Sequence, residues 1–202
     1  MAKAPSSEPT DARILEFAAE HIRRHGMERT TVVAIAREAA MSHGNVYRYF
    51  PSKEALVDAV TDQWLKPIES GLRDICDGPD PAFDKLERIL SAVQRAYRNK
   101  LEADPKIFEL FIEASVQGRG VARKHRLKLQ AEVRSVLEDG MASGAFPAHD
   151  IRRALALVFD IAHRFINPPA IRADGDVARP QIEGRFERVL RALRRTLGSG
   201  VL

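Results

Sequence analysis

The stretch that decides the fold is TTVVAIAREAAMSHGNVYRYFPSKEAL, residues 30–56. Its apolar residues recur at i, i+3, i+4 and i+7 from Val32, which predicts a short helix that ends near Ala40 and that the preceding threonines can cap. A connection over 41–43 leads to a second short helix over 44–50, too short to be stable without packing. Two short helices joined by a tight turn predict a helix-turn-helix, whose second helix enters the major groove of DNA.

The flanking segments supply the helices that hold this pair. An apolar stripe over 11–25 predicts a preceding helix, with Asp11 as its cap and Gly26 as its end. Pro51 ends the second short helix, and Ser52 caps a fourth helix that begins at Lys53. The expected core of this small unit consists of Ile14, Ala18, Ile22, Ile35, Ala36, Met41, Val46 and Phe50.

The side chains left on the outer side of 44–50 have the chemistry of base and phosphate recognition. An Asn can pair with adenine through two hydrogen bonds, an Arg with guanine or a phosphate, and a Tyr hydroxyl with a phosphate oxygen. Gly44 lets the backbone approach closely, and Lys53 places a charge at the start of the fourth helix. The candidate DNA contacts are His43, Gly44, Asn45, Tyr47, Arg48, Tyr49 and Lys53.

The stretch 30–56 closely resembles the DNA-binding motif of the tetracycline-repressor (TetR) family. The likeness lies in the Thr before the first short helix, the Ile-Ala pair, Ser-x-Gly, Tyr-x-x-Phe and Lys-x-x-Leu, and it covers roughly the first third of the chain. It implies a helix-turn-helix over 31–50 with DNA contacts at Thr31, Ser42, Gly44, Asn45, Tyr47, Tyr49 and Lys53. It also implies a homodimer joined through the last two long helices and a ligand pocket in a second, larger domain.

One residue departs from the family's pattern. The family usually has Gly in the turn where this chain has Ala40. If the backbone there needs a positive φ, Ala destabilises the turn by about 1 kcal/mol, which packing can absorb.

Helical periodicity continues through the rest of the chain, and no segment alternates as a strand does, so the fold class is all-α. We expect a disordered tail over 1–10, a helix-turn-helix DNA-binding domain over 11–66, and a larger effector-binding and dimerisation domain over 67–202. Pro67 is expected to bend or end the fourth helix. Further helices are expected over about 86–101, 107–114, 121–143, 151–166 and 182–197, with a proline break after the fourth of these and a polar loop over 172–180.

Aromatic and polar residues interrupt the apolar helices of the larger domain, and such groups can line a ligand pocket. More often, residues of this kind belong to a core or to an interface between subunits. The pocket candidates are Tyr97, Phe108, Phe111, Phe159, His163, Arg164 and Asn167. The helix over 151–166 carries apolar residues on nearly every side, which leaves little room for a face toward solvent.

Composition argues against several other functions. No apolar run approaches the roughly 20 residues that cross a bilayer, and 1–10 lacks the apolar region of a signal peptide, so we expect a cytoplasmic protein without a membrane partner. The lone Cys76 excludes an internal disulfide and a thiolate zinc site. His21 and His25 have metal-ligand spacing but no third ligand clustered with them, so we expect no metal and no cofactor. No Ser-His-Asp or paired-carboxylate arrangement can be argued, so we expect no enzyme.

The expected function is that of a transcriptional regulator. We expect a repressor that binds a palindromic double-stranded DNA operator as a dimer and responds to a small-molecule effector of unknown identity. One alternative is an activator, or a regulator without an effector whose second domain only dimerises. Another is a helical adaptor that has lost DNA binding, because acidic and basic residues nearly balance over 1–64 and create no general positive field.

Overall fold

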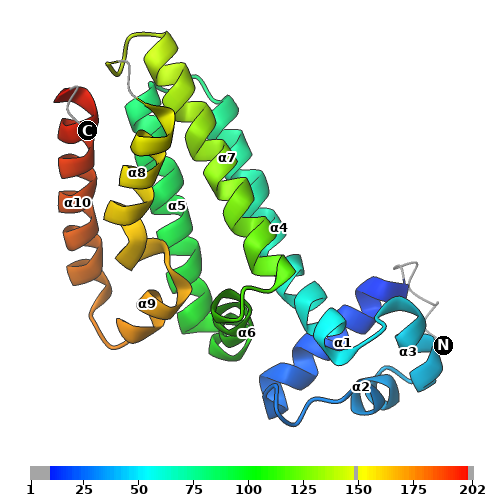
Figure 1. Ribbon diagram of the computed structural model, residues 1–202. Coiled ribbons are helices and arrows are strands. Elements are labelled where there is room, and N and C mark those ends of the chain that lie inside the picture. Colours follow the sequence, from blue (N-terminus) through cyan, green and yellow to red (C-terminus); the bar gives the residue numbers. More distant parts are fainter. Residues whose placement is uncertain (1–9, 148–149, 200–202) are drawn as a thin grey trace, which may run out of the picture.

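The computed structural model describes residues 10–147 and 150–199, which form helices and their connections (Figure 1). The predicted all-α class is confirmed. The helices are α1 (Thr10–His25), α2 (Val32–Glu38), α3 (His43–Tyr49), α4 (Lys53–Asp77), α5 (Ala82–Ala103), α6 (Pro105–Val116), α7 (Gly120–Ala142), α8 (Ile151–Ile166), α9 (Pro168–Ala173) and α10 (Arg179–Ser199). The tail predicted over 1–10 lies outside the described residues except for Thr10, which begins α1. Asp11 therefore lies in the first turn of α1 and not at its cap.

α1, α2, α3 and the first turns of α4 enclose a small core. Ile14, Ile35 and Val46 are fully buried in it, and Met41 and Phe50 are half-buried and pack against it. The core predicted for the three short helices is therefore confirmed. α2 and α3 have seven residues each, so this shared core must hold them in place.

α4 is one continuous helix of 25 residues that runs from the small core into a larger one, and Pro67 lies inside it. The expectation that the helix ends at Pro67 is wrong. A proline removes one backbone N–H from the helix ladder, which weakens the helix locally. Burial on both sides offsets the loss, because Leu65 and Leu72 are at most 2% exposed in the larger core. The domain boundary at 67 stays a proposal, and it falls inside this helix.

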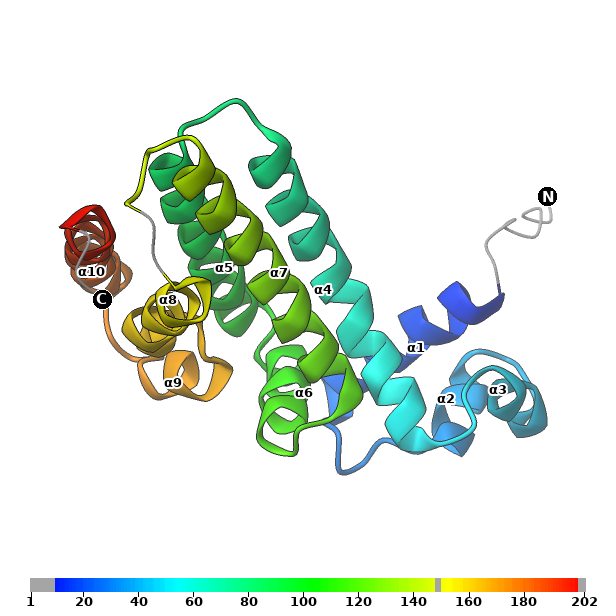
Figure 2. The same ribbon diagram turned by 45° about the horizontal axis from the view of Figure 1, so that its top comes forward.

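The larger unit is a helical bundle. α4, α5 and α7 run side by side, and α8 and α10 lie on the side farthest from α2 and α3 in both views (Figures 1 and 2). Its core is continuous from Leu65 on α4 to Leu197 on α10. Among the described helices, none is both long and apolar enough to span a membrane.

The segment after α8 differs from the prediction. The two prolines there end α8 but also begin the short helix α9, because proline is favoured in the first turn of a helix. The side chain of Asn167 caps α9 by accepting a hydrogen bond from the N–H of Ala170 at 3.2 Å. α9 extends to Ala173 and α10 already begins at Arg179, so the loop predicted over 172–180 is shorter than expected.

α6 contributes to both cores. Ile107 and Leu110 pack into the small core, whereas Phe108 and Phe111 pack into the larger one. Trp64 on α4 is partly buried and packs against both. The two units are therefore joined through packed side chains, and a displacement of α6 must disturb both.

Candidate nucleic-acid interface and ligand cavity

Three hydroxyl side chains fix the starts of the helices around the turn. Thr31, Ser42 and Ser52 are the N-caps of α2, α3 and α4, and each hydroxyl oxygen accepts a hydrogen bond from the backbone N–H three residues later, at 3.1, 3.2 and 3.0 Å. Caps of this kind typically contribute about 1 kcal/mol each. Thr31 and Ser42 are also exposed, so these two predicted DNA contacts have a structural role and are accessible as well.

The turn between α2 and α3 contains a residue in the left-handed region, Ala40, with a φ of 52°. The N–H of Met41 donates to the carbonyl oxygen of Ala36 at 2.8 Å, and the N–H of Ala40 donates to that of Arg37 at 3.2 Å. This is the Schellman pattern that ends many helices, usually with glycine at the left-handed position. The backbone at Ala40 therefore has the positive φ that the family's usual glycine would favour, and the turn holds an L residue in a strained conformation.

α3 buries one side and exposes the other. Val46 is fully buried, whereas Tyr47 is 44% exposed and Tyr49 is 37% exposed. These are large aromatic groups on a helix of seven residues, and both reach the surface. The other predicted contacts on this helix also reach the surface: His43, Gly44 and Arg48 are exposed, and Asn45 is half-buried.

Arg48 and Tyr49 lie against each other at the end of α3. The Nη2 atom of Arg48 donates to the Tyr49 hydroxyl oxygen at 3.2 Å, and the guanidinium carbon lies 5.1 Å from the ring centre. Hydrogen bonding to Thr10, and then to Arg48, lowers the pKa of the Tyr49 phenol. The pair presents a cation and a hydroxyl group together, a combination that suits a phosphate oxygen.

Lys53, predicted to place a charge at the start of the fourth helix, uses that charge in a backbone contact. Its Nζ donates to the carbonyl oxygen of Met27 at 2.8 Å, and its side chain is half-buried. It therefore ties the start of α4 to the connection between α1 and α2.

Gly44 was predicted to allow a close approach of the backbone. A Cβ at this position would meet no atom within 4 Å. The fold itself does not require glycine at this position.

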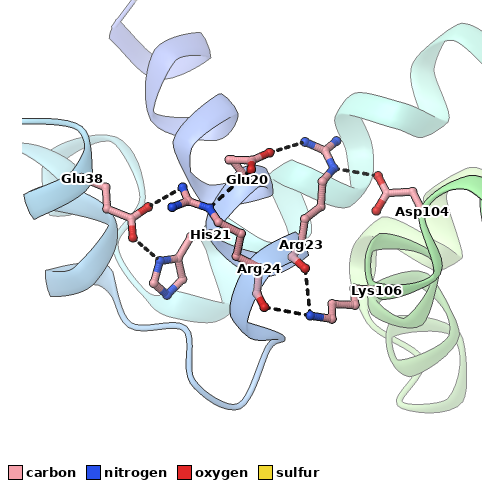
Figure 3. Close-up of polar contacts among 7 residues, drawn as sticks. All are labelled: Glu20, His21, Arg23, Arg24, Glu38, Asp104 and Lys106. Atoms are coloured by element: carbon pink, nitrogen blue, oxygen red, sulfur yellow. Dashed lines mark hydrogen bonds and ion pairs between the residues drawn. The ribbon is translucent and has the colours of Figure 1, made fainter.

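Polar contacts fasten α6 to the end of α1 (Figure 3). The Nε atom of Arg23 lies 2.9 Å from Oδ2 of Asp104, the residue that precedes α6. Nζ of Lys106 donates to the backbone carbonyl oxygens of Arg23 and Arg24 at 2.8 and 2.9 Å. Lys106 thereby satisfies carbonyl groups of the last turn of α1, which have no donor within their own helix.

A cavity of about 360 Å³ lies between α5, α6, α7 and α8 in the larger unit. Leu129 contributes to its apolar wall, and the exposed Arg123 and Arg126 lie at its rim. The predicted pocket residues that line it are Tyr97, Phe111, Phe159, His163 and Asn167.

Two predicted pocket residues lie elsewhere. Phe108 is fully buried, with its ring centre 6.3 Å from that of Trp64, and belongs to the core. Arg164 turns away from the cavity, and its Nη2 donates to the carboxylate of Asp174 at 2.6 Å. Periodicity alone did not separate these two from the residues that line the cavity, because all of them lie on largely apolar helices.

A buried chain of hydrogen bonds begins at one wall of the cavity. The Tyr97 hydroxyl oxygen lies 2.7 Å from Nε2 of His125, and Nδ1 of His125 lies 2.9 Å from the Glu69 carboxylate, which also pairs with Lys128. Because a carboxylate only accepts, the neutral His125 ring donates to Glu69 through Nδ1 and accepts a hydrogen bond from the Tyr97 hydroxyl at Nε2. Burial lowers the pKa of His125, against the effect of Glu69, and burial also raises the pKa of Tyr97.

This chain of hydrogen bonds could not be predicted from the sequence. His125 and Glu69 are 56 residues apart, and neither has a local pattern that marks it. Only the packing of α4 against α7 brings them together.

The structure also places a carboxylate beside the histidine pair on α1. Glu38, the last residue of α2, lies with its Oε1 2.8 Å from Nδ1 of His21. One ligand atom from each of His21, His25 and Glu38 lies within 4.8 Å of the other two. The premise that no third ligand is close is therefore wrong, because the third ligand comes from another helix, 17 residues from His21.

Two family profiles match this chain. Residues 14–60 match the family of bacterial regulatory proteins named after tetR, and residues 82–190 match the tetracyclin repressor-like C-terminal domain. The second match alone covers more than half of the 202 residues. The two matches coincide with the small unit and with most of the larger bundle.

Individual relatives give the same result. YhgD of Bacillus subtilis, an uncharacterized HTH-type transcriptional regulator, is 26% identical over 156 residues, which are 73% of this chain and 81% of YhgD. The solved structure of PfmR, a TetR-family transcriptional regulator from Thermus thermophilus, is 25% identical with a TM-score of 0.56 and covers 96% of this chain and 98% of its own. FadR from Bacillus subtilis, solved in complex with stearoyl-CoA, has 17% identity and a TM-score of 0.62 over 95% of this chain and 99% of its own, a likeness of fold.

Proposed function

The chain belongs to the tetracycline-repressor (TetR) family of DNA-binding transcriptional regulators, and we propose that it is a repressor whose α3 binds in the major groove of an operator. The observation that carries this proposal is the surface of α3. Tyr47 and Tyr49 are exposed, while Val46 anchors the helix in the small core. In this proposal Asn45 reads a base edge and Arg48 contacts guanine or, together with Tyr49, a phosphate. The other phosphate contacts are Thr31, Ser42, His43 and Tyr47, with Gly44 allowing close approach and Lys53 acting beside them.

The repressor acts as a homodimer joined through α8 and α10. Leu155, Leu157 and Ile161 on α8 are only half-buried within one chain, although they pack against its core. An apolar face of this kind is a typical interface, and a twofold axis lets two identical faces cover each other. Two α3 helices related by that axis suit half-sites about 34 Å apart on a near-palindromic operator.

The effector binds in the cavity between α5, α6, α7 and α8. Its volume of about 360 Å³ lies near the lower end of the range for ligand pockets, about 300–1,000 Å³, so a small organic molecule fits. Phe111 and Phe159 suit an apolar body, and the rim residues Arg123 and Arg126 suit an anionic group. FadR, which has the same fold, was solved with stearoyl-CoA, so a chain of this architecture can hold an organic ligand.

α6 couples the cavity to the DNA-binding unit. Phe111 on α6 lines the cavity, whereas Ile107 and Leu110, on the same helix, lie in the small core. A ligand that displaces Phe111 therefore shifts the support beneath α1. In this shifted state the two α3 helices of the dimer are mis-spaced for the operator, so a ligand that prefers it must lower operator affinity by the same coupling free energy, typically about 1–3 kcal/mol.

A binding titration with the DNA upstream of the chain's own gene tests the DNA-binding role. We expect the wild-type chain to bind with an affinity that falls steeply with salt, and Tyr47→Ala to bind more weakly. Leu127→Ala is the control, because Leu127 is 55% exposed on α7, away from α3. If the folded wild-type chain retards neither this DNA nor any fragment of its own genome, an adaptor that has lost DNA binding replaces the proposal.

Fluorescence of the single tryptophan tests the effector role. Trp64 is the only tryptophan of the chain, and its ring centre lies 5.5 Å from that of Phe111. A small organic acid that enters the cavity should change this fluorescence and release DNA together. If no compound in a metabolite screen does both, a regulator without an effector is favoured. If the expression of a reporter gene under the regulated promoter falls, and does not rise, when the gene for this chain is deleted, the chain is an activator.

A further inference from the structure

The ends of α1 and α2 meet at a cluster of two histidines and a glutamate. His21 and His25 are separated by one turn of α1, with ring centres 4.6 Å apart. Glu38 ends α2 and lies with Oε1 2.8 Å from Nδ1 of His21. One ligand atom from each of the three lies within 4.8 Å of the other two. We propose that His21 and His25 bind a divalent transition-metal ion of the zinc class, with Glu38 holding the His21 ring in place from α2 by accepting from its Nδ1 atom.

The hydrogen bonding of His21 supports this proposal. Its side chain is only 7% exposed, and among the described residues its Nε2 atom is buried with no hydrogen-bond partner. The Glu38 carboxylate can only accept, so Nδ1 of the neutral ring carries the proton and Nε2 holds a free lone pair. A buried polar atom without a partner is destabilising. Histidine ligands of metals typically coordinate through one ring nitrogen while the other donates to a carboxylate, as His21 does here.

The donor set selects the class of ion. Imidazole nitrogens suit zinc, copper and nickel, whereas calcium and magnesium need mainly oxygen ligands. Zinc–nitrogen bonds of about 2.0–2.1 Å require ligand atoms roughly 3.4 Å apart, so the cluster must contract when the ion enters. His25 is exposed and can turn toward His21 without disturbing the core. Water can complete the coordination on this open side.

A nearby arginine does not block the site. Nη2 of Arg24 lies 3.2 Å from Oε2 of Glu38, but Arg24 is half-exposed and also pairs with Glu20 at 3.4 Å (Figure 3). Arg24 and His21 use different oxygens of Glu38, so Arg24 can stay paired with Glu38 when an ion binds to the histidines.

Calorimetry and thermal unfolding of the full, untagged chain test the site with zinc chloride as the probe. We expect saturable binding of one ion per chain and a rise in melting temperature that a chelator reverses. His25→Ala should lower the zinc affinity at least about tenfold, since even outer-shell partners of metal ligands contribute 10–100-fold. Glu38→Gln, which keeps the size of the side chain, should also lower it. Glu20→Gln is the matched control, because Glu20 contacts Arg24 but lies outside the cluster.

The possible outcomes are distinct from those of the DNA-binding tests, because the readout needs no DNA. Circular dichroism without metal establishes that His25→Ala is folded, which its exposure leads us to expect. Zinc binding that is lost in His25→Ala and kept in Glu20→Gln supports the site. Zinc that fails to bind the wild-type chain, or that binds His25→Ala as tightly as the wild type, overturns it.

Discussion

Arg23 on α1 and Asp104 at the start of α6 form an ion pair, with Nε 2.9 Å from Oδ2, although 81 residues separate them in the chain. The carboxylate is largely buried, at 13% exposed, whereas the arginine side chain is 45% exposed. Asp104 makes no capping hydrogen bond to α6, and its other ion pair, with Lys100, is longer at 3.7 Å. The contact with Arg23 is the one that holds α1 against α6. This contact lies beside Ile107, the α6 residue that packs in the small core.

We expect Asp104→Asn to loosen α1 without unfolding the chain. Because Arg23 is half-exposed, the loss of global stability should stay within about 1 kcal/mol, but local opening of α1 should become easier. Hydrogen exchange of peptides from Thr10–His25 should therefore accelerate, while peptides from α10 stay unchanged. Glu138→Gln is the control, since it removes an exposed pair with Arg134 on α7. Equal hydrogen-exchange rates of α1 in the wild type and in Asp104→Asn would show that the ion pair does not stabilise α1.

Asn45→Ala should reduce sequence discrimination more than overall affinity. The backbone N–H of Asn45 donates to Ser42, and this cap survives the substitution, so α3 stays folded. Loss of a paired contact to adenine typically removes about 1–3 kcal/mol of discrimination. Titrations against an operator and against altered operators, at several salt concentrations, measure this difference. The control is Asn99→Ala on α5, and a preference unchanged by Asn45→Ala would remove this residue from base recognition.

Ala40→Gly should stabilise the chain. Ala40 has a φ of 52°, a conformation that disfavours an L residue by about 1–2 kcal/mol. Glycine relieves that strain but gains freedom in the unfolded chain, so the net gain should be about 0.5–1 kcal/mol. Denaturant unfolding of the two proteins measures it. Ala39→Gly provides the contrast, because Ala39 has a φ of −75° and glycine there should only destabilise.

The local parts of the fold could be predicted from the sequence because neighbouring residues determine them. The spacing of Val46 and Phe50 assigned the outer face of α3, and the structure has the predicted residues on that surface. The Ser and Thr caps were readable for the same reason. The helix end predicted at Pro67 was wrong, because the burial of Leu65 and Leu72 outweighs the local effect of the proline.

Contacts between distant segments could not be predicted. Ile107 and Leu110 have the same periodicity as other core residues, and nothing in it indicates that they pack beneath α1. The acceptor of Lys53, the Met27 carbonyl, could not be foreseen, because it lies in another connection. For the same reason the spacing of His21 and His25 could be seen in the sequence, whereas Glu38 could not be linked to them, because only the packing of α2 on α1 brings it there.

The stability of the chain should fall below about pH 6.5 through His125. Burial is the main cause that lowers the pKa of His125 in the folded chain, while the unfolded chain has the ordinary value of about 6.5. Below that value the unfolded chain binds a proton at His125 more readily than the folded chain does. The free energy of unfolding therefore decreases as the pH falls from about 6.5 to the folded-state pKa, and above about pH 6.5 nothing is lost through His125. Melting temperatures between about pH 5 and 8 measure the effect.

His125→Gln isolates this contribution. A glutamine amide can still donate toward Glu69 and accept from Tyr97, but it does not titrate. The variant should be less stable than wild type at neutral pH and should lose less stability on acidification. Parallel curves for the two proteins would assign the acid sensitivity to other groups.

Gly140→Ala should destabilise the end of α7. A Cβ on Gly140 would lie 2.0 Å from Cε2 of Phe146, and this ring is only 2% exposed and packs against Phe83 at 4.2 Å between centres. The ring must shift within a filled core, which typically costs about 1–3 kcal/mol. Gly120→Ala is the matched control on the same helix, because a Cβ there meets nothing within 4 Å and alanine favours a helix.

A double variant shows whether the clash with Phe146 is the cause. Phe146→Leu alone should destabilise by removing part of a buried ring. In the double variant with Gly140→Ala, the smaller side chain leaves room for the new methyl group. The loss of stability in the double variant should therefore be smaller than the sum of the losses in the two single variants. Denaturant unfolding of the four proteins gives this interaction free energy. Strict additivity would mean that the alanine acts through the backbone of α7, and that Gly140 is not needed to admit the Phe146 ring.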